Sequence, residues 1–416
     1  MNRDSQPKIA EYIARSQRRA YEAAGLDLPT LRYGRSVLQL AAQSLIAPFR
    51  VKGFQSKAEV LESGVLAMTS YVANPPFTRH EYLQSYVYAN NILQWCRNIC
   101  EQGSEELARI ADVDASVFQT SNRTVAVASL PVAEANATVE LLPDTQTPIV
   151  FFNITMYYLL SAFARLFAMS CETSGRRAYN QELLASRIAD GDPVFTDACD
   201  VLRGVIYGNT KLMTYRTREG RFPQESLWQT SQYRSHGFRF IAAHELSHIC
   251  LGHLDSNDPD PRMVVDTRFS RFQLAELDAD LLALVMNSYC IAAEANSYEE
   301  PISRETSLGR SFIHQDFVLR VFRMVEGVCN ALDGREGGKS RIIGHPAYAD
   351  RIFVARRLLE EGLPQDMLSD MRERTEGQHE TFFRHFATIF LDAEMARGDR
   401  PHVSSLFVDA YGLSGS

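Results

Sequence analysis

The apolar residues of this chain recur with helical spacing over most of its length. This helical spacing covers most of residues 9–110. The strongest helical segments there are 38–45, 82–96 and 107–113. Residues 124–153 differ, because short runs rich in valine and threonine are separated by prolines, a pattern typical of strands. We therefore expect a small β-sheet after the N-terminal helical region, with strands at 125–130, 138–142 and 149–152.

The pattern after this sheet predicts mainly helices. Residues 148–153 indicate a buried strand that leads directly into a core helix at 156–169. Two short apolar runs, 205–207 and 212–215, flank Gly208 and Asn209 and predict a hairpin. Further helices are expected at 312–332 and 379–396, and a polar loop at 298–309. The prediction is an α+β fold that is predominantly helical, with an N-terminal helical region at 1–118 and a second domain at 119–416.

Composition excludes some classes of partner. The chain has 416 residues, of which 45% are hydrophobic, and this is enough to bury a substantial core. The formal net charge is −8 at pH 7, so no basic surface for nucleic acid or an anionic membrane is expected.

Cysteine usage and hydropathy favour a cytoplasmic protein. The seven cysteines are scattered and odd in number, which is not the pattern of a disulfide framework. Residues 1–19 are polar and do not resemble a secretory signal. The most apolar window, 149–164, contains Asn153 and Ser161 and is shorter than the ~20 residues that span a bilayer. We therefore expect no membrane span.

The chain carries the pattern HExxH at residues 244–248, within a stretch that has helical periodicity. Two histidines four apart on a helix point to the same side, so His244 and His248 can bind one metal ion. Glu245 lies next to that side and can serve as a general base. A catalytic zinc usually has a third protein ligand and an open position.

Two downstream residues could supply the third ligand. His253 lies one place nearer than the last histidine of the longer pattern HExxHxxGxxH, so we expect it beside the site rather than in it. Glu276 is the better candidate, because it opens a long apolar stretch and shares a helix face with Asp280. Ser270 and Gln273 form a capping box at the start of that helix. We expect Glu276 to bind the metal and Asp280 to hydrogen-bond a histidine ligand; the alternative is an exposed carboxylate pair.

These residues resemble the gluzincin metallopeptidases, in which a glutamate on a later helix completes an HExxH zinc site. The form Glu-x-x-Ala-Asp at 276–280 is similar to that of the CAAX prenyl protease and HtpX branch. That branch also has a His-Pro followed by an arginine, here His345, Pro346 and Arg351. The motifs cover residues 244–351, roughly a quarter of the chain. A gluzincin of this size without membrane spans also resembles the phage-exclusion peptidases of the Lit type. The resemblance implies a zincin-like domain with one zinc ion per chain.

The leading hypothesis is an intracellular zinc-dependent endopeptidase that acts on a protein or peptide. Glu245 would move a proton from water to the leaving amine. The resemblance makes His345 the candidate donor to the oxyanion, with Tyr348 and Arg351 as alternatives. A competing hypothesis is a zinc-stabilised sensor or interaction module without turnover, and Glu245 argues against it because a structural site does not need this carboxylate. An integral membrane protease is disfavoured by the hydropathy.

Overall fold

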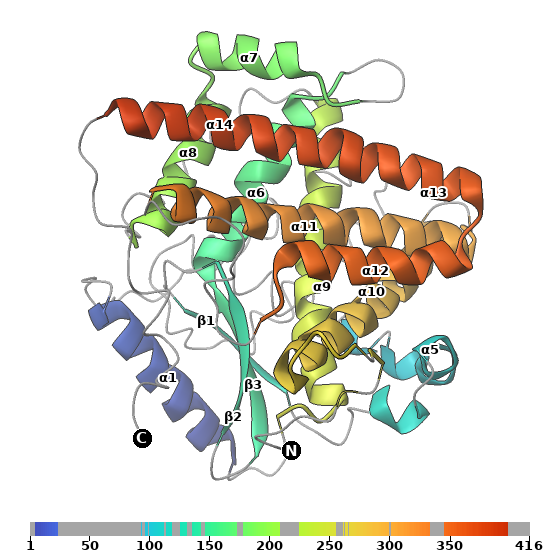
Figure 1. Cartoon of the computed structure of the whole chain (residues 1–416). Coiled ribbons are helices and arrows are strands. Elements are labelled where there is room, and N and C mark those ends of the chain that lie inside the picture. The colour runs from blue at the N-terminus through green and yellow to red at the C-terminus, as the bar shows by residue number, and fades with distance from the viewer. Residues whose placement is uncertain are drawn as a thin grey trace.

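The computed structural model describes residues 5–23, 93–118, 125–208, 224–298, 301–332 and 345–397, with short gaps inside the second, third and fourth ranges. Within these residues, long helices form a bundle on one face of a three-stranded sheet, and one N-terminal helix covers the other face (Figure 1). The expected α+β class, predominantly helical with a small sheet, is confirmed.

The sheet contains β1 (Ala126–Leu130), β2 (Ala137–Leu142) and β3 (Thr147–Asn153) in the order β1-β3-β2. The central strand β3 runs parallel to β1 and antiparallel to β2, and all of its residues are buried. Because side chains alternate along a strand, Val150 and Phe152 join the helical core whereas Ile149 and Phe151 face the other side. β2 is an edge strand, and its outer side is unpaired within the described part of the chain.

The second face of the sheet is covered by α1 (Ser5–Ala23). Ile9 packs there in an apolar cluster with Ile149 and Phe151. The Tyr12 hydroxyl donates a hydrogen bond to Glu140 Oε2 on β2, with an O···O distance of 2.8 Å. Both faces of β3 are therefore apolar, which explains the continuous hydrophobic run at its centre.

Four long helices form the core of the bundle. α6 (Ile154–Met169) follows β3 without a loop and packs on α9 (Gln224–Cys250). α9 packs on α10 (Arg271–Tyr298), which in turn packs on α11 (Arg304–Leu332). Gly237 lets α9 approach its neighbours closely, because a Cβ atom there would lie 2.9 Å from Val318 Cγ2 and 3.8 Å from Leu160 Cδ1.

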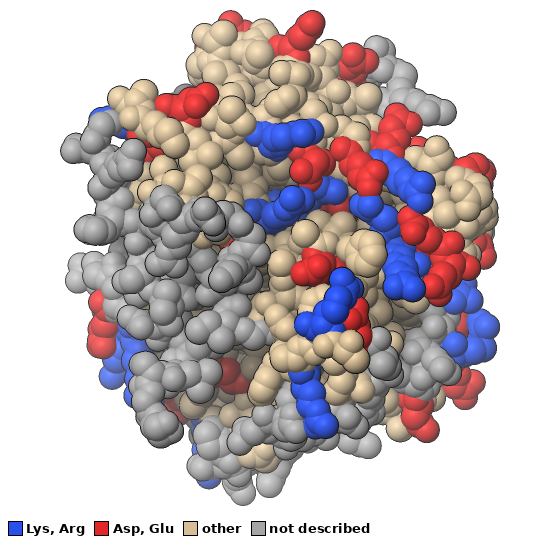
Figure 2. Space-filling model, viewed as in Figure 1, with Lys and Arg blue, Asp and Glu red and all other residues tan. Residues whose placement is uncertain are grey.

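The remaining elements surround this core. They are α5 (Ser104–Ala111), the 3-10 helix η1 (Ala115–Phe118), α7 (Gln181–Ala189), α8 (Pro193–Ile206), α12 (Tyr348–Gly362), α13 (Gln365–Arg372), the π-helix η5 (Glu373–His379) and α14 (Glu380–Ala396). α5 packs on α10, and α12 and α14 pack on α11. Basic and acidic side chains interleave over α12 and α13 (Figure 2), as in the ion pair of Arg372 with Glu360 at 2.6 Å.

The predicted hairpin at 205–207 and 212–215 is wrong in its first strand. Val205 and Ile206 end α8, and Tyr207 is its C-terminal capping residue. The helix is favoured because the Asp192 side chain accepts a hydrogen bond from the backbone N–H of Val194 at its start. Gly208 has φ of +63°, so it terminates a helix rather than forming a hairpin turn. Residues 212–215 lie outside the described part of the chain.

The predicted loop at 298–309 is also wrong over much of its length. α10 continues to Tyr298, and α11 already begins at Arg304. The cause is a helix cap that the sequence analysis missed: Ser303 Oγ accepts a hydrogen bond from the backbone N–H of Thr306 at 3.1 Å.

The three strands, the core helix after β3 and the helix at 379–396 are confirmed within a few residues. The helix predicted at 312–332 ends at Leu332 as expected but already begins at Arg304. The predicted segment 38–45 and most of 82–96 lie outside the described residues. None of the described helices is long and apolar enough to cross a membrane.

Candidate metal centre

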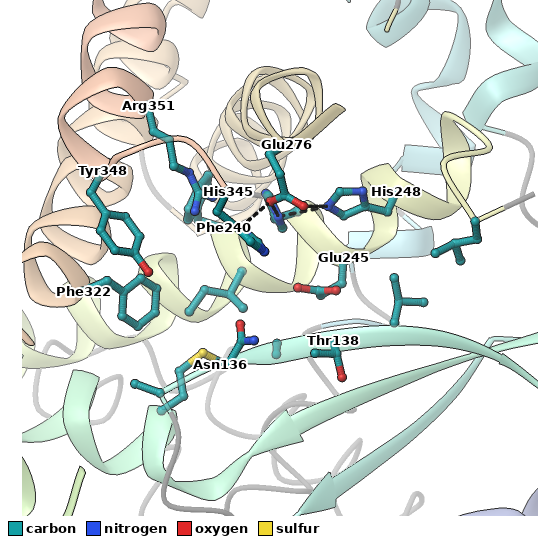
Figure 3. Close-up of a pocket in the computed structure, with 17 residues that line it drawn as sticks. Asn136, Thr138, Phe240, Glu245, His248, Glu276, Phe322, His345, Tyr348 and Arg351 are labelled. Carbon is teal, nitrogen blue, oxygen red and sulfur yellow. Dashed lines mark hydrogen bonds and ion pairs between the residues drawn. The ribbon is translucent and has the colours of Figure 1, made fainter. Parts of the chain in front are cut away.

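The HExxH residues lie in the last turns of α9, on the side that faces α10 and the sheet (Figure 3). The spacing of four residues brings the two rings together, with Nε2 of His244 and Nε2 of His248 3.2 Å apart. Gly252, with φ of +73°, ends the helix soon afterwards.

The start of α10 carries three carboxylates with three different partners. The expected capping box is present: Ser270 and Gln273 each accept a hydrogen bond from the other's backbone N–H, at 3.3 and 3.0 Å. Asp278 Oδ1 accepts hydrogen bonds from the backbone N–H groups of Met263 and Val264, so it fixes the segment before the helix. Glu276 and Asp280 lie one turn apart and both face α9. This acidic turn is largely buried, which argues against the alternative of an exposed carboxylate pair.

The ligand atoms of His244, His248 and Glu276 form a group that could hold a metal ion, all within 4.8 Å of one another. Glu276 Oε2 lies 3.4 Å from His244 Nε2, and Glu276 Oε1 lies 3.5 Å from His248 Nε2. Two ligands of a tetrahedral ion with bonds of about 2.0 Å are separated by about 3.3 Å. Glu276 Oε2 is buried and completes no hydrogen bond among the described residues, although ring nitrogens face it. The donor set therefore fits a cation shared by the three side chains.

A chain of polar contacts orients His244. Its Nδ1 lies 3.0 Å from Asp280 Oδ1, and Arg351 donates two hydrogen bonds of 2.6 Å to the same carboxylate. Burial opposes the charged form of Asp280, but the Arg351 guanidinium lowers the pKa of this carboxyl. Asp280 therefore stays ionised and faces Nδ1 of His244, which leaves Nε2 as the ring nitrogen on the side of Glu276. Burial opposes the charged form of His244, but Asp280 and Glu276 raise the pKa of this ring to about 10, so a metal at Nε2 would take the place of a proton held there.

His253 performs the same task for the second histidine. Its Nδ1 lies 3.0 Å from Nδ1 of His248, and its backbone N–H donates to the His248 carbonyl. Burial lowers the pKa of His248 to about 3, so this ring is neutral. When His248 Nδ1 carries the hydrogen and His253 accepts it, Nε2 of His248 offers a lone pair to a metal. His253 thus lies beside the site, as expected.

Glu245 lies between the ligand group and β2 and lines a cavity of about 220 Å³ (Figure 3). Burial raises the pKa of Glu245 to about 7. Among the described residues its carboxylate has no hydrogen-bond partner. A carboxyl group with such a pKa can both accept and release a proton near neutral pH.

His345 and Tyr348 complete the cavity from the side of α12 (Figure 3). His345 Nδ1 lies 3.0 Å from Glu276 Oε2, so its ring contacts a ligand of the metal position. Tyr348 packs its ring against Phe322, with ring centroids 5.8 Å apart. The Arg351 guanidinium lies 5.5 Å from the centre of the Tyr348 ring. Arg351 itself is engaged by Asp280, and this makes it a positioning group rather than a donor to a substrate.

Comparison with known proteins does not assign the chain. No family model, curated protein or solved structure matches it. The site must therefore be interpreted from its own geometry.

The structure brings together all seven residues named from the sequence, with His244, Glu245 and His248 from α9, Glu276 and Asp280 from α10, His345 before α12 and Arg351 within it. The sequence analysis did not identify the opposite wall of the cavity, which is formed by residues 135–139 of β2 and its approach. The runs rich in valine and threonine located the strand itself, but the sheet order that makes it an edge strand depends on pairings distant in sequence.

We expect Asp280→Asn to weaken metal binding by roughly ten- to a hundredfold, because His244 would lose the charged acceptor that fixes its ring. Competition with a chelator of known affinity measures this change. Asp278→Asn is the matched control: it alters a buried carboxylate on the same helix that contacts backbone N–H groups instead of a ligand. An equal loss of affinity in both variants would show a general effect on folding and contradict the proposed orienting role.

Proposed function

We propose that this protein is a zinc-dependent endopeptidase that hydrolyses a protein or peptide chain. The observation that carries the proposal is the convergence of His244, His248 and Glu276, whose facing nitrogen and oxygen atoms lie 3.2 to 3.5 Å apart. A set of two imidazole nitrogens and one carboxylate is the donor set of open catalytic zinc sites. The zincin-like identity of the domain is part of this proposal.

A zinc ion bound here would polarise a peptide carbonyl and lower the pKa of water. Glu245 lines the same cavity as the three ligands, where it would accept a proton from the attacking water and deliver it to the leaving amine. His345 lies at the cavity and in contact with Glu276, from where its ring can donate to the carbonyl oxygen. Asp280 and Arg351 hold His244 in place.

The position of β2 at the edge of the sheet favours a polypeptide as the substrate. Thr138 of β2 and Asn136, which directly precedes the strand, line the cavity opposite Glu245 (Figure 3). An extended peptide can pair with such an edge by strand addition, and its peptide bond would then lie beside the metal position. Met156 and Phe240 form apolar parts of the wall, so an apolar side chain next to the cleaved bond is favoured.

The alternative of a zinc-stabilised module without turnover finds less support. A structural zinc site is closed by protein ligands on all sides. Here a cavity of about 220 Å³ adjoins the three ligands, and the Glu245 carboxylate lines it.

A reducing compartment such as the cytoplasm is part of the proposal, because all seven cysteines are free thiols.

The test of function in cells is a proteome-wide comparison of new protein termini between cells that make the intact protein and cells that make Glu245→Gln. Termini found only with the intact protein would identify the substrate. Identical termini in both would contradict the peptidase.

His345→Ala is expected to keep its metal and to lower turnover by roughly a hundredfold, the scale of losing one donor to the oxyanion. The loss should appear in kcat more than in KM, because this hydrogen bond strengthens in the transition state. Tyr348→Phe is the comparison variant, since it keeps the ring against Phe322 and removes only the hydroxyl. If Tyr348→Phe loses the activity and His345→Ala keeps it, the donor is the tyrosine.

A further inference from the structure

A second cavity, of about 710 Å³, lies between the first half of α9, the start of α11 and the segment of α13 and η5. It is larger than the cavity at the metal position, which measures about 220 Å³. Tyr233, which lines it, precedes His244 by about 16 Å along the axis of α9 at about 1.5 Å per residue. The two cavities are lined by different residues.

The inner wall contains a buried histidine with a free acceptor. His314 is only 9% exposed, and its Nδ1 donates a hydrogen bond of 2.7 Å to the Arg310 carbonyl. Its ring packs against Tyr233 and His236, with centroid distances of 5.2 and 4.4 Å. Burial lowers the pKa of His314 to about 3, so the ring is neutral and Nε2 keeps its lone pair. No described residue bonds to that nitrogen.

A second buried relay fixes the hydroxyl of Tyr233. His379 Nδ1 lies 2.9 Å from Asp316 Oδ2, which also accepts a hydrogen bond of 2.8 Å from Arg320 Nε. Burial opposes ionisation of Asp316, but His379 and Arg320 lower the pKa of its carboxyl. The ionised carboxylate accepts a hydrogen bond from Nδ1 of His379, so that nitrogen carries the ring hydrogen. His379 Nε2 therefore accepts the hydrogen bond of the Tyr233 O–H at 3.0 Å. The phenolic oxygen of Tyr233 is therefore left as an acceptor.

The donor of this wall is the amide of Gln232. Arg239 donates to His236 Nδ1 at 3.1 Å, which places the remaining hydrogen of that ring on Nε2. His236 Nε2 then donates to Gln232 Oε1 at 2.7 Å. The Gln232 NH₂ group is thus the part of this amide that can serve a ligand.

The rim of the cavity carries exposed charges of both signs. Asp366 and Asp370 come from α13, and Arg310 and Arg374 face them from α11 and η5. Asp370 and Arg374 form an ion pair of 3.0 Å. An anion such as a nucleotide would meet two carboxylates here, whereas a ligand with one positive and one negative group can match the rim. Apolar side chains of the wall provide contact for a non-polar part of the ligand; they are Trp228, Ile313 and Met367.

We propose that this cavity binds a zwitterionic ligand, an amino acid or short peptide with both termini free, whose inner end donates an N–H or O–H to His314. Its free amino and carboxylate groups pair with the charged rim. A volume of this size accommodates a molecule of several hundred daltons. The site is independent of the proposed peptidase function. It would exist whether the metal centre is catalytic or belongs to a module without turnover.

The test compares two peptides that differ by one hydroxyl, Gly-Gly-Tyr and Gly-Gly-Phe, by titration calorimetry on the full chain. We expect Gly-Gly-Tyr to bind about tenfold more tightly, which corresponds to about 1.4 kcal/mol. In His314→Phe, which keeps an aromatic ring against Tyr233 and His236, the two peptides should bind equally. Acetylation of the amino end or amidation of the carboxyl end should weaken binding in the intact protein.

Two further variants locate the ligand. Asp366→Asn combined with Arg374→Gln alters only exposed rim residues, so it should fold normally and bind Gly-Gly-Tyr more weakly. Glu245→Gln alters the other cavity and should bind it unchanged. The proposal is overturned if Glu245→Gln loses the peptide while His314→Phe keeps it, or if neither peptide binds at millimolar concentration. Tighter binding of the capped peptides would also overturn it.

Discussion

Peptide hydrolysis by the Glu245→Gln variant is expected to fall at least about a hundredfold below that of the intact protein, with the zinc content unchanged. Glutamine keeps the size of the side chain and removes only the basic oxygen. Glu245 lies outside the group of three ligand atoms, and its pKa near 7 places it where a proton carrier is effective. Cleavage of an unfolded protein such as casein, followed by mass spectrometry of the fragments, measures the change.

Zinc analysis and circular dichroism provide the control for this experiment, because both should be the same for the two proteins. Glu245→Asp is a useful companion variant: it keeps the carboxylate but withdraws it by one methylene, so it should retain part of the activity. Equal cleavage by wild type and Glu245→Gln at equal zinc content would refute the peptidase and favour the zinc-stabilised module.

Glu276→Ala is expected to reduce zinc from one ion per chain to a small fraction of that, and to abolish hydrolysis with it. The variant removes the only carboxylate of the ligand group and leaves two imidazoles, which hold zinc weakly on their own. Metal analysis after dialysis against a weak chelator measures the loss. The cost to folding should be small, because the other interactions of α10, including its capping box and Asp278, remain.

His253→Ala is the matched control for Glu276→Ala. It removes a buried side chain from the same site, but one that touches His248 rather than the metal position. It should weaken zinc binding while a full complement of zinc is still reached at excess metal. If His253→Ala fails to take up zinc and Glu276→Ala keeps it, the ligand set is a different one.

The local parts of this site could be predicted because they depend on short-range rules. A spacing of four residues on a helix is sufficient to bring His244 beside His248, and to align Glu276 with Asp280. The capping box at Ser270 shows where α10 begins. These rules hold whatever the rest of the chain does.

The long-range parts could not be predicted from physical rules alone. The ion pair of Arg351 with Asp280 joins two helices, and nothing in the sequence sets their separation. The contact of His345 with Glu276 depends in the same way on how the segment before α12 returns to α10. Only the motif resemblance pointed to Arg351 and His345. The edge position of β2 likewise depends on a long-range pairing: β1 pairs with β3, although β2 lies between them in the sequence.

The two errors in the fold prediction have a common cause, which is a helix cap. Asp192 and Ser303 each accept a backbone N–H at the start of a helix. The residues around Ser303 were predicted as a loop, and the end of the helix that Asp192 caps was predicted as a strand. A cap changes the state of several following residues at once, so missing one cap shifts a whole boundary.

The covering of the sheet by α1 bears on how the protein can be shortened for biochemical work. A fragment that retains every residue of the metal centre but lacks α1 would expose Ile149 and Phe151 to water. It would also lose the hydrogen bond from Tyr12 to Glu140, which ties the N-terminal helix to the strand beside the cavity. An exposed apolar sheet face next to an unpaired strand edge is a template for self-association. A well-behaved minimal version of the protein therefore has to keep its first helix, even though that helix contributes nothing to the metal site.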